Sequence, residues 1–158
     1  MKHYRNKLLC VLGISLAIYS AVSIGITMSI APMRQWHWEE LEFVLPGALV
    51  LLSVTLWMCH LARHPSRREE ISAWTFFWRG TGLLILVTVL YIHIRAGALF
   101  EDPGEFGGPV LYMIIIFSLI SQLPGFAAGF IPSFLFVHRL VRCLENSQDG
   151  KDEQISGH

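Results

Sequence analysis

The sequence predicts an all-α, polytopic membrane protein with four transmembrane helices. Of its 158 residues, 53% are hydrophobic and only 15% are charged, whereas a soluble domain is about 25% charged. The apolar residues form four blocks, and the basic residues gather in alternate segments between them. The 12 basic and 12 acidic residues leave no formal net charge. This balance excludes the basic surplus of a nucleic-acid binder, and the apolar content excludes a disordered chain.

Each apolar block, with its flanks, is long enough to cross a bilayer as a helix. The expected spans are residues 8–30, 43–62, 76–96 and 109–139. A hydrocarbon core of about 30 Å requires about 20 helical residues. The bilayer offers backbone amides no partner, and no block alternates polar and apolar residues as a barrel strand does, so each block is predicted to be helical. The polar residues 145–158 are predicted to form a disordered cytoplasmic tail.

The basic residues set the expected orientation, because positive charges stay on the cytoplasmic side of a membrane. The two loops predicted to lie on the outer side of the membrane contain only two basic residues, Arg34 and Arg95. We therefore predict a multi-pass protein of a bacterial inner membrane, with both termini in the cytoplasm. The uncharged run Leu8–Ile30 exceeds the about 7 to 15 residues of a signal-peptide core, so we expect it to remain as an anchor. The basic residues assigned to the cytoplasmic side are Lys2, Arg5, Lys7, Arg63, Arg67, Arg68, Arg79, Arg139, Arg142 and Lys151.

The third block has distinct signals at its cytoplasmic end. Ser66 and Glu69 have the spacing of a capping box, which predicts that this helix begins near Ser66. Trp74 and Trp78 share one helical face and are expected at the headgroup level as part of an aromatic belt. Arg79 follows them, and its side chain is long enough to reach back to the same interface.

The fourth block is too long for a simple span, since residues 109–139 would extend about 46 Å as a straight helix. Pro124 and Pro132 each remove an intrahelical hydrogen bond. One interpretation is a single long, kinked helix that projects from the bilayer. The other is a broken helix or re-entrant hairpin near Pro124. Two complete spans would place Arg139 outside, so we favour the kinked helix.

Small residues recur every four positions in two blocks. Such a stripe allows another backbone to approach closely. We expect these stripes either to pack on each other or to contact a partner, which is another membrane protein or a second copy of the chain. Internal packing alone is the simpler interpretation. The first ridge is Gly13, Ala17, Ala21, Gly25 and Ser29, and the second ridge is Ser121, Gly125, Gly129 and Ser133.

The two outer loops are acidic and contain two tryptophans. An acidic face attracts cations and basic segments, and aromatic side chains anchor partners. This predicts a docking surface, with an ordinary solvated pair of loops as the alternative. The candidate residues are Trp36, Trp38, Glu39, Glu40, Arg95, Glu101 and Asp102.

The seven histidines raise the question of a metal or haem. No HExxH or CxxC motif occurs, so we expect no metal and no cofactor. The alternative is a haem held by His60 and His138, which are predicted to lie on the same side of the membrane. The default interpretation is an interfacial histidine with a satisfied hydrogen bond.

Nothing in the sequence indicates catalysis. It has no nucleophile elbow and no phosphate-binding glycine loop, and no acidic residue lies in the four blocks. We therefore expect a non-enzymatic protein that acts by helix packing with a membrane partner in the surrounding lipid. A redox or haem-binding subunit and a small facilitator-type transporter are the alternatives.

The predicted architecture resembles the four-span immunity proteins that protect bacteria from pore-forming colicins. The resemblance covers the number of helices, the two cytoplasmic termini and the basic middle loop. It also covers the proline-containing last helix, with Ile131-Pro132 and Val137-His138-Arg139. It implies binding to the membrane-inserted hairpin of a toxin through helix contacts in the bilayer. It carries over no individual functional residue. A small subunit of a larger membrane complex is an equally good interpretation.

Overall fold

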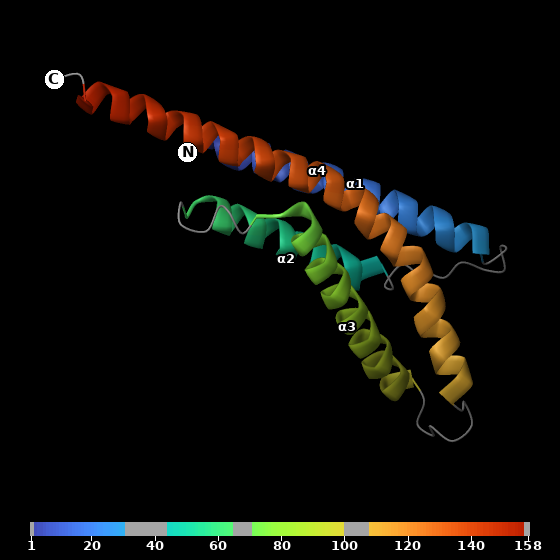
Figure 1. The fold of residues 1–158 in the computed structure, drawn as a ribbon. Helices are drawn as coiled ribbons and strands as arrows, with labels where there is room; N and C mark the ends of the chain where they lie inside the picture. Colours follow the sequence, from blue (N-terminus) through green and yellow to red (C-terminus); the bar gives the residue numbers. More distant parts are fainter. Residues whose placement is uncertain (1, 31–43, 65–70, 100–107, 157–158) are drawn as a thin grey trace.

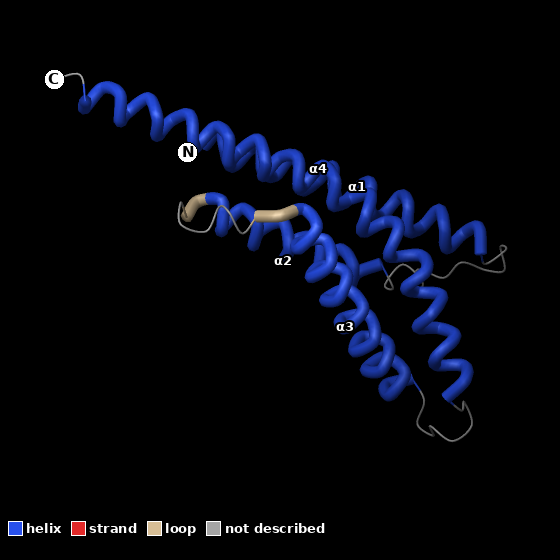
Figure 2. The backbone as a smooth tube through the Cα atoms, viewed as in Figure 1, coloured by secondary structure: helices blue, strands red, loops and turns tan. Residues whose placement is uncertain are grey.

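The computed structural model describes residues 2–30, 44–64, 71–99 and 108–156, and the regular structure in these ranges is helical (Figure 2). All four helices contain a stretch that is long and apolar enough to cross a membrane, which confirms the predicted number of spans. These stretches are Asn6–Ser29, Leu45–Ala62, Ala73–Arg95 and Leu111–Leu144. The complete helices are α1 (Lys2–Ile30), α2 (Leu45–Ala62), α3 (Ala73–Leu99) and α4 (Gly108–Ser156).

Helix α4 organises the bundle, because it packs against each of the other three helices and most extensively against α1. Figure 1 shows that α4 changes direction along its length. Its earlier part lies beside α3, and its later part lies beside α1. The ends of the chain, marked N and C, lie toward the same end of the α1–α4 pair.

The backbone of α4 is helical through both Pro124 and Pro132, so the described residues contain no hairpin at Pro124. The helix also continues to Ser156, whereas the sequence led us to expect a disordered tail from residue 145. Residues with high helix propensity, including Glu145, Gln148 and Glu153, allow α4 to continue beyond its apolar part.

Helix α3 begins later than the capping signal predicts. Ile71 and Ser72 are not helical, and the first turn is held by the amide of Phe76, which donates to the carbonyl oxygen of Ser72 at 3.1 Å. The prediction that a helix runs continuously from Ser66 into α3 is therefore wrong. Ser66 and Glu69 themselves lie outside the described residues. Phe76, in the first turn of α3, is buried against the other helices. This tertiary packing determines where the helix begins.

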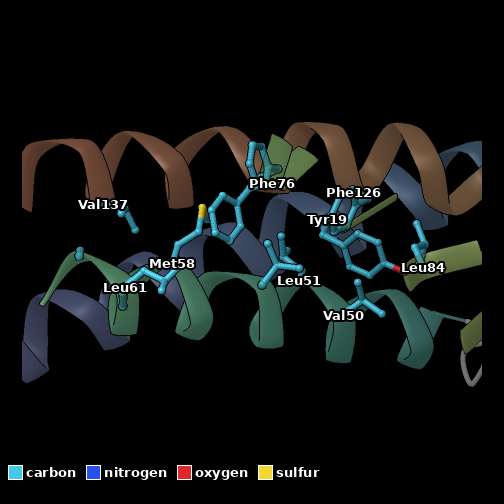
Figure 3. Packing of buried hydrophobic residues seen from close by; sticks show 13 residues of the cluster. Tyr19, Val50, Leu51, Met58, Leu61, Phe76, Leu84, Phe126 and Val137 are labelled. Atoms are coloured by element: carbon cyan, nitrogen blue, oxygen red, sulfur yellow. The ribbon is translucent and has the colours of Figure 1, made fainter. Parts of the chain in front are cut away.

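The bundle directs large apolar side chains outward and encloses a mixed interior. Leu49, Leu86 and Ile94 are among the many exposed apolar residues. Tyr19 lies inside the core among Val50, Leu84 and Phe126 (Figure 3). An apolar exterior suits a lipid environment, in which polar groups and close packing hold helices together. The buried polar residues are Ser15, Ser23, Thr55, Thr81, Thr88, Ser118, Ser121, Gln122 and Ser133.

Candidate functional site

The second ridge is buried at the interface of α4 with α1 and α2. Its members Ser121, Gly125, Gly129 and Ser133 are all buried. A methyl group placed on Gly129 would lie 2.8 Å from the carbonyl oxygen of Ser15 and 2.9 Å from Cδ2 of Leu51. Glycine is therefore required here because the backbones of α1 and α4 approach too closely for a side chain.

The surface of α1 that receives this ridge is a stripe formed by Ser15, Tyr19 and Ser23. Ser15 meets Ser133, and Tyr19 meets Gly129. Ser23 meets Gly125. The contacts advance by one helical turn on each helix and in opposite chain directions. The two helices therefore pack antiparallel, as the four-span topology requires.

The first ridge lies on a different face of α1, and no helix of the described part of the chain covers it. Gly13, Ala17, Ala21, Gly25 and Ser29 are all exposed. A methyl group placed on Gly13 or Gly25 would meet nothing within 4 Å. Only 17% of the most apolar stretch of α1 is buried, compared with 56% for α2. The two ridges thus do not pack on each other, and the first ridge faces the surroundings of the bundle.

A polar cluster in the interior joins three helices through Ser133. The hydroxyl oxygens of Ser15 and Ser133 are 2.8 Å apart, and the Thr55 hydroxyl lies 3.0 Å from the same oxygen of Ser133. The Thr55 hydroxyl also lies 2.7 Å from the carbonyl oxygen of Leu51. These contacts fix α1, α2 and α4 relative to one another in an environment that supplies little hydrophobic driving force.

We expect Ser133→Ala to lower the free energy of unfolding by about 1 kcal/mol, because it removes the oxygen shared by Ser15 and Thr55. Unfolding of the purified protein in mixed micelles, titrated with a denaturing detergent, measures this loss. Ser53→Ala is the matched control, since Ser53 is exposed and donates to the Leu49 carbonyl of its own helix at 2.8 Å. An equal loss in both variants would contradict a role for Ser133 between helices.

A second polar cluster, around Gln122, joins all four helices. The Tyr19 hydroxyl donates to the carbonyl oxygen of Val44, the residue before α2, at 2.9 Å. The Oε1 atom of Gln122 lies 3.4 Å from that hydroxyl and 3.3 Å from the hydroxyl of Thr88 on α3. The Nε2 atom of Gln122 is buried and has no hydrogen-bond partner among the residues that the structure describes.

Tyr19 and Gln122 were not among the residues predicted from the sequence. A signal for Gln122 was present, because it is the one amide side chain in the block 109–137. A polar residue within a membrane span usually faces the bundle interior. Tyr19 carried no comparable signal, since an aromatic residue in a span is equally at home against lipid or protein.

The histidines considered for haem lie on the outside of the bundle. His60 and His138 are both exposed. The ring of His60 lies 4.9 Å from that of His64, and the ring of His138 stacks on Phe134 of the same helix. Nδ1 of His93 lies 2.8 Å from the carbonyl oxygen of Val89, as expected for a histidine satisfied by its own helix. The described residues contain no cluster of three metal-ligating side chains.

The predicted outer docking surface falls largely on segments that the structure does not describe. Arg95 is half-buried near the end of α3. The other candidates lie outside the described residues: Trp36, Trp38, Glu39, Glu40, Glu101 and Asp102.

The geometry defines the class of this protein as multi-pass and all-helical, with four helices able to cross a membrane. Comparison with family models, with curated proteins and with solved structures finds no match. The exposed and buried faces of the helices are therefore the features of this protein that bear on its function.

Proposed function

We propose that this chain is a non-enzymatic integral membrane protein that acts by packing a helix against a membrane partner. The observation that carries the proposal is the exposure of the first ridge on α1. Gly13 and Gly25 leave open space beside the helix, and the small residues between them continue that surface for about 18 Å. A partner helix can approach such a surface as closely as α4 approaches the other side of α1.

The second ridge supports the proposal by comparison. Gly125 and Gly129 have the same spacing as the small residues of the first ridge, and a neighbouring backbone lies against them. In the first ridge, Gly13 and Gly25 have no such neighbour among the residues that the structure describes. The partner is a helix of another membrane protein or of a second copy. The acidic outer loops with Trp36 and Trp38 add a second docking surface.

The location that we propose is a bacterial inner membrane, with both termini in the cytoplasm. The antiparallel packing of α1 and α4 supports a common compartment for the two ends. The exposed residues Lys7, Arg63, Arg139 and Arg142 belong to the matching ends of their helices. Positive charge favours the cytoplasmic side.

We also propose that the prolines cause the bend of α4. Pro124 and Pro132 have no amide hydrogen, so the carbonyl groups of Ile120 and Ala128 lose their helical donors. The bend lets one helix pack on α3 with its earlier part and on α1 with its later part.

The most concrete form of this function is an immunity-type protein that binds a pore-forming toxin in the bilayer, and the second is a small subunit of a membrane complex. For the first, expression must rescue cells from one toxin and not from unrelated toxins. In both functions the first ridge is the contact surface, so contact between α1 and its partner is the quantity to measure.

Site-specific photocrosslinking in native membranes tests the contact surface. We expect a photoreactive residue at Ala17 to give a discrete protein adduct, and Gly25→Ile to reduce that adduct about tenfold by filling the space beside the helix. The stability of the chain should not change, because the added side chain meets nothing within it. A photoreactive residue at Leu49, which is exposed on α2, is the control. Equal labelling from Ala17 and Leu49 would refute the proposal.

A further inference from the structure

The seam, which is the outer surface where α2 packs against α3, carries an exposed cation next to an aromatic ring. Arg79 is exposed on α3, and its guanidinium carbon lies 5.9 Å from the ring centroid of Trp57 on α2. Trp57 is itself fixed by an edge contact with Phe76, at 5.3 Å between ring centroids. This contact holds the guanidinium on the outer surface of the seam by a cation–π interaction.

The position of this pair along the helices places it at the boundary between the headgroups and the hydrocarbon core. Helix α2 has 18 residues, or about 27 Å, so its whole length is needed to cross the membrane. Trp57 lies about 7.5 Å before the end of that helix. Trp74 and Trp78, exposed belt residues near the start of α3, mark the headgroup level, and Arg79 directly follows Trp78.

A guanidinium at this boundary is stabilised by an anionic partner. The four spans contain no Asp or Glu, and Trp57 is the side chain that Arg79 contacts among the described residues. The neighbouring exposed groups are His60, near the end of α2, and His64, which follows that helix, and their rings lie 4.9 Å apart. This end of the seam therefore offers hydrogen-bond donors and positive charge.

An apolar track leads from Arg79 toward the other side of the membrane. Leu83, Leu86 and Leu90 continue the exposed face of α3 at helical spacing. A methyl group placed on Gly82 would meet nothing within 4 Å, so the surface next to Arg79 is open. A molecule with an anionic end and a long apolar chain fits this arrangement better than a free anion does.

We propose that Arg79 and Trp57, with His60 beside them, form a binding site for the phosphate headgroup of an anionic phospholipid. The planar guanidinium donates two parallel hydrogen bonds to the phosphate oxygens. An acyl chain lies along Leu83, Leu86 and Leu90. An anionic headgroup is preferred to a zwitterionic one because the site supplies the Arg79 guanidinium, and the described spans that line it supply no carboxylate. The proposal rests on the membrane-spanning class of the chain and is independent of the partner of α1.

Native mass spectrometry of the full chain tests the site. The protein is extracted from vesicles of equimolar phosphatidylglycerol and phosphatidylcholine, and the retained lipids are counted. We expect phosphatidylglycerol to be retained preferentially, and Arg79→Gln to reduce this preference about fivefold. Arg139→Gln is the control, since Arg139 is also exposed at the matching end of α4, and its preference should stay within about twofold of the parent.

Two further variants keep the test decisive if Arg79→Gln does not fold. Arg79→Lys retains the charge but not the planar pair of donors, and Trp57→Leu removes the aromatic platform. Each should reduce the preference for phosphatidylglycerol by about twofold to threefold. Unchanged preference in these variants would overturn the proposal, as would equal retention of both lipids by the parent protein. Displacement of the lipid by millimolar inorganic phosphate would overturn the assignment to a phospholipid.

Discussion

Replacement of Gly129 by isoleucine is expected to destabilise the folded bundle by about 3 kcal/mol or more. The first atom of the new side chain would lie 2.8 Å from a backbone oxygen of α1 and 3.1 Å from Cβ of Tyr19. A backbone carbonyl cannot move aside as the end of a flexible side chain does, so α1 and α4 must separate. Detergent-titrated unfolding of the purified protein measures the loss.

The control for this substitution is Gly13→Ile on the exposed face of α1. The two variants make the same chemical change in a helix, but the new side chain at Gly13 meets nothing within 4 Å. We expect the stability of Gly13→Ile to stay within about 0.5 kcal/mol of the parent. If both variants lost the same stability, helix propensity and not close packing would explain the effect at Gly129.

Truncation of Tyr19 to alanine is expected to cost about 3 to 5 kcal/mol, because it leaves a cavity where three helices meet. Tyr19 is completely buried. Its ring lies against Gly47 at the start of α2 and against Gly125 on α4, where neither neighbour has a side chain to fill the space. The same unfolding titration measures the effect.

Tyr19→Phe separates the contribution of the ring from that of the hydroxyl. This variant keeps the packing and loses the hydrogen bond to the Val44 carbonyl and the contact with Gln122. We expect a loss of about 1 kcal/mol. A loss as large as that of Tyr19→Ala would show that the Gln122 cluster, and not the volume of the ring, holds the helices together.

The four spans were predictable because the physics of a bilayer is local in sequence. Apolar length alone identifies a helix that must satisfy its backbone within lipid. The boundary of α3 was not predictable in the same way. The Ser66 signal is also local, but Phe76 is buried by contacts from other helices, and those contacts set the start of the helix at Ala73.

The two ridges were visible in the sequence, but the surface that meets the second ridge was not. A spacing of four identified both ridges, but Ser15, Tyr19 and Ser23 have the same spacing on another face of α1. Periodicity gives the faces of a helix and does not say which face meets a neighbour. The choice depends on side-chain shape across the interface, as in the fit of Tyr19 against Gly47, which lies far from it in the chain.

The extensive contact between α1 and α4 has a consequence for biogenesis. During synthesis α1 enters the membrane before the other three helices and α4 enters after them, so the two main partners meet only when insertion is complete. Until then Ser15 and Ser23 lack the α4 surface that covers them, and Tyr19 has only its contacts with Val44 and Gly47 at the start of α2. Assembly of this bundle is therefore a late event, and chains released without α4 would be natural targets of membrane quality control.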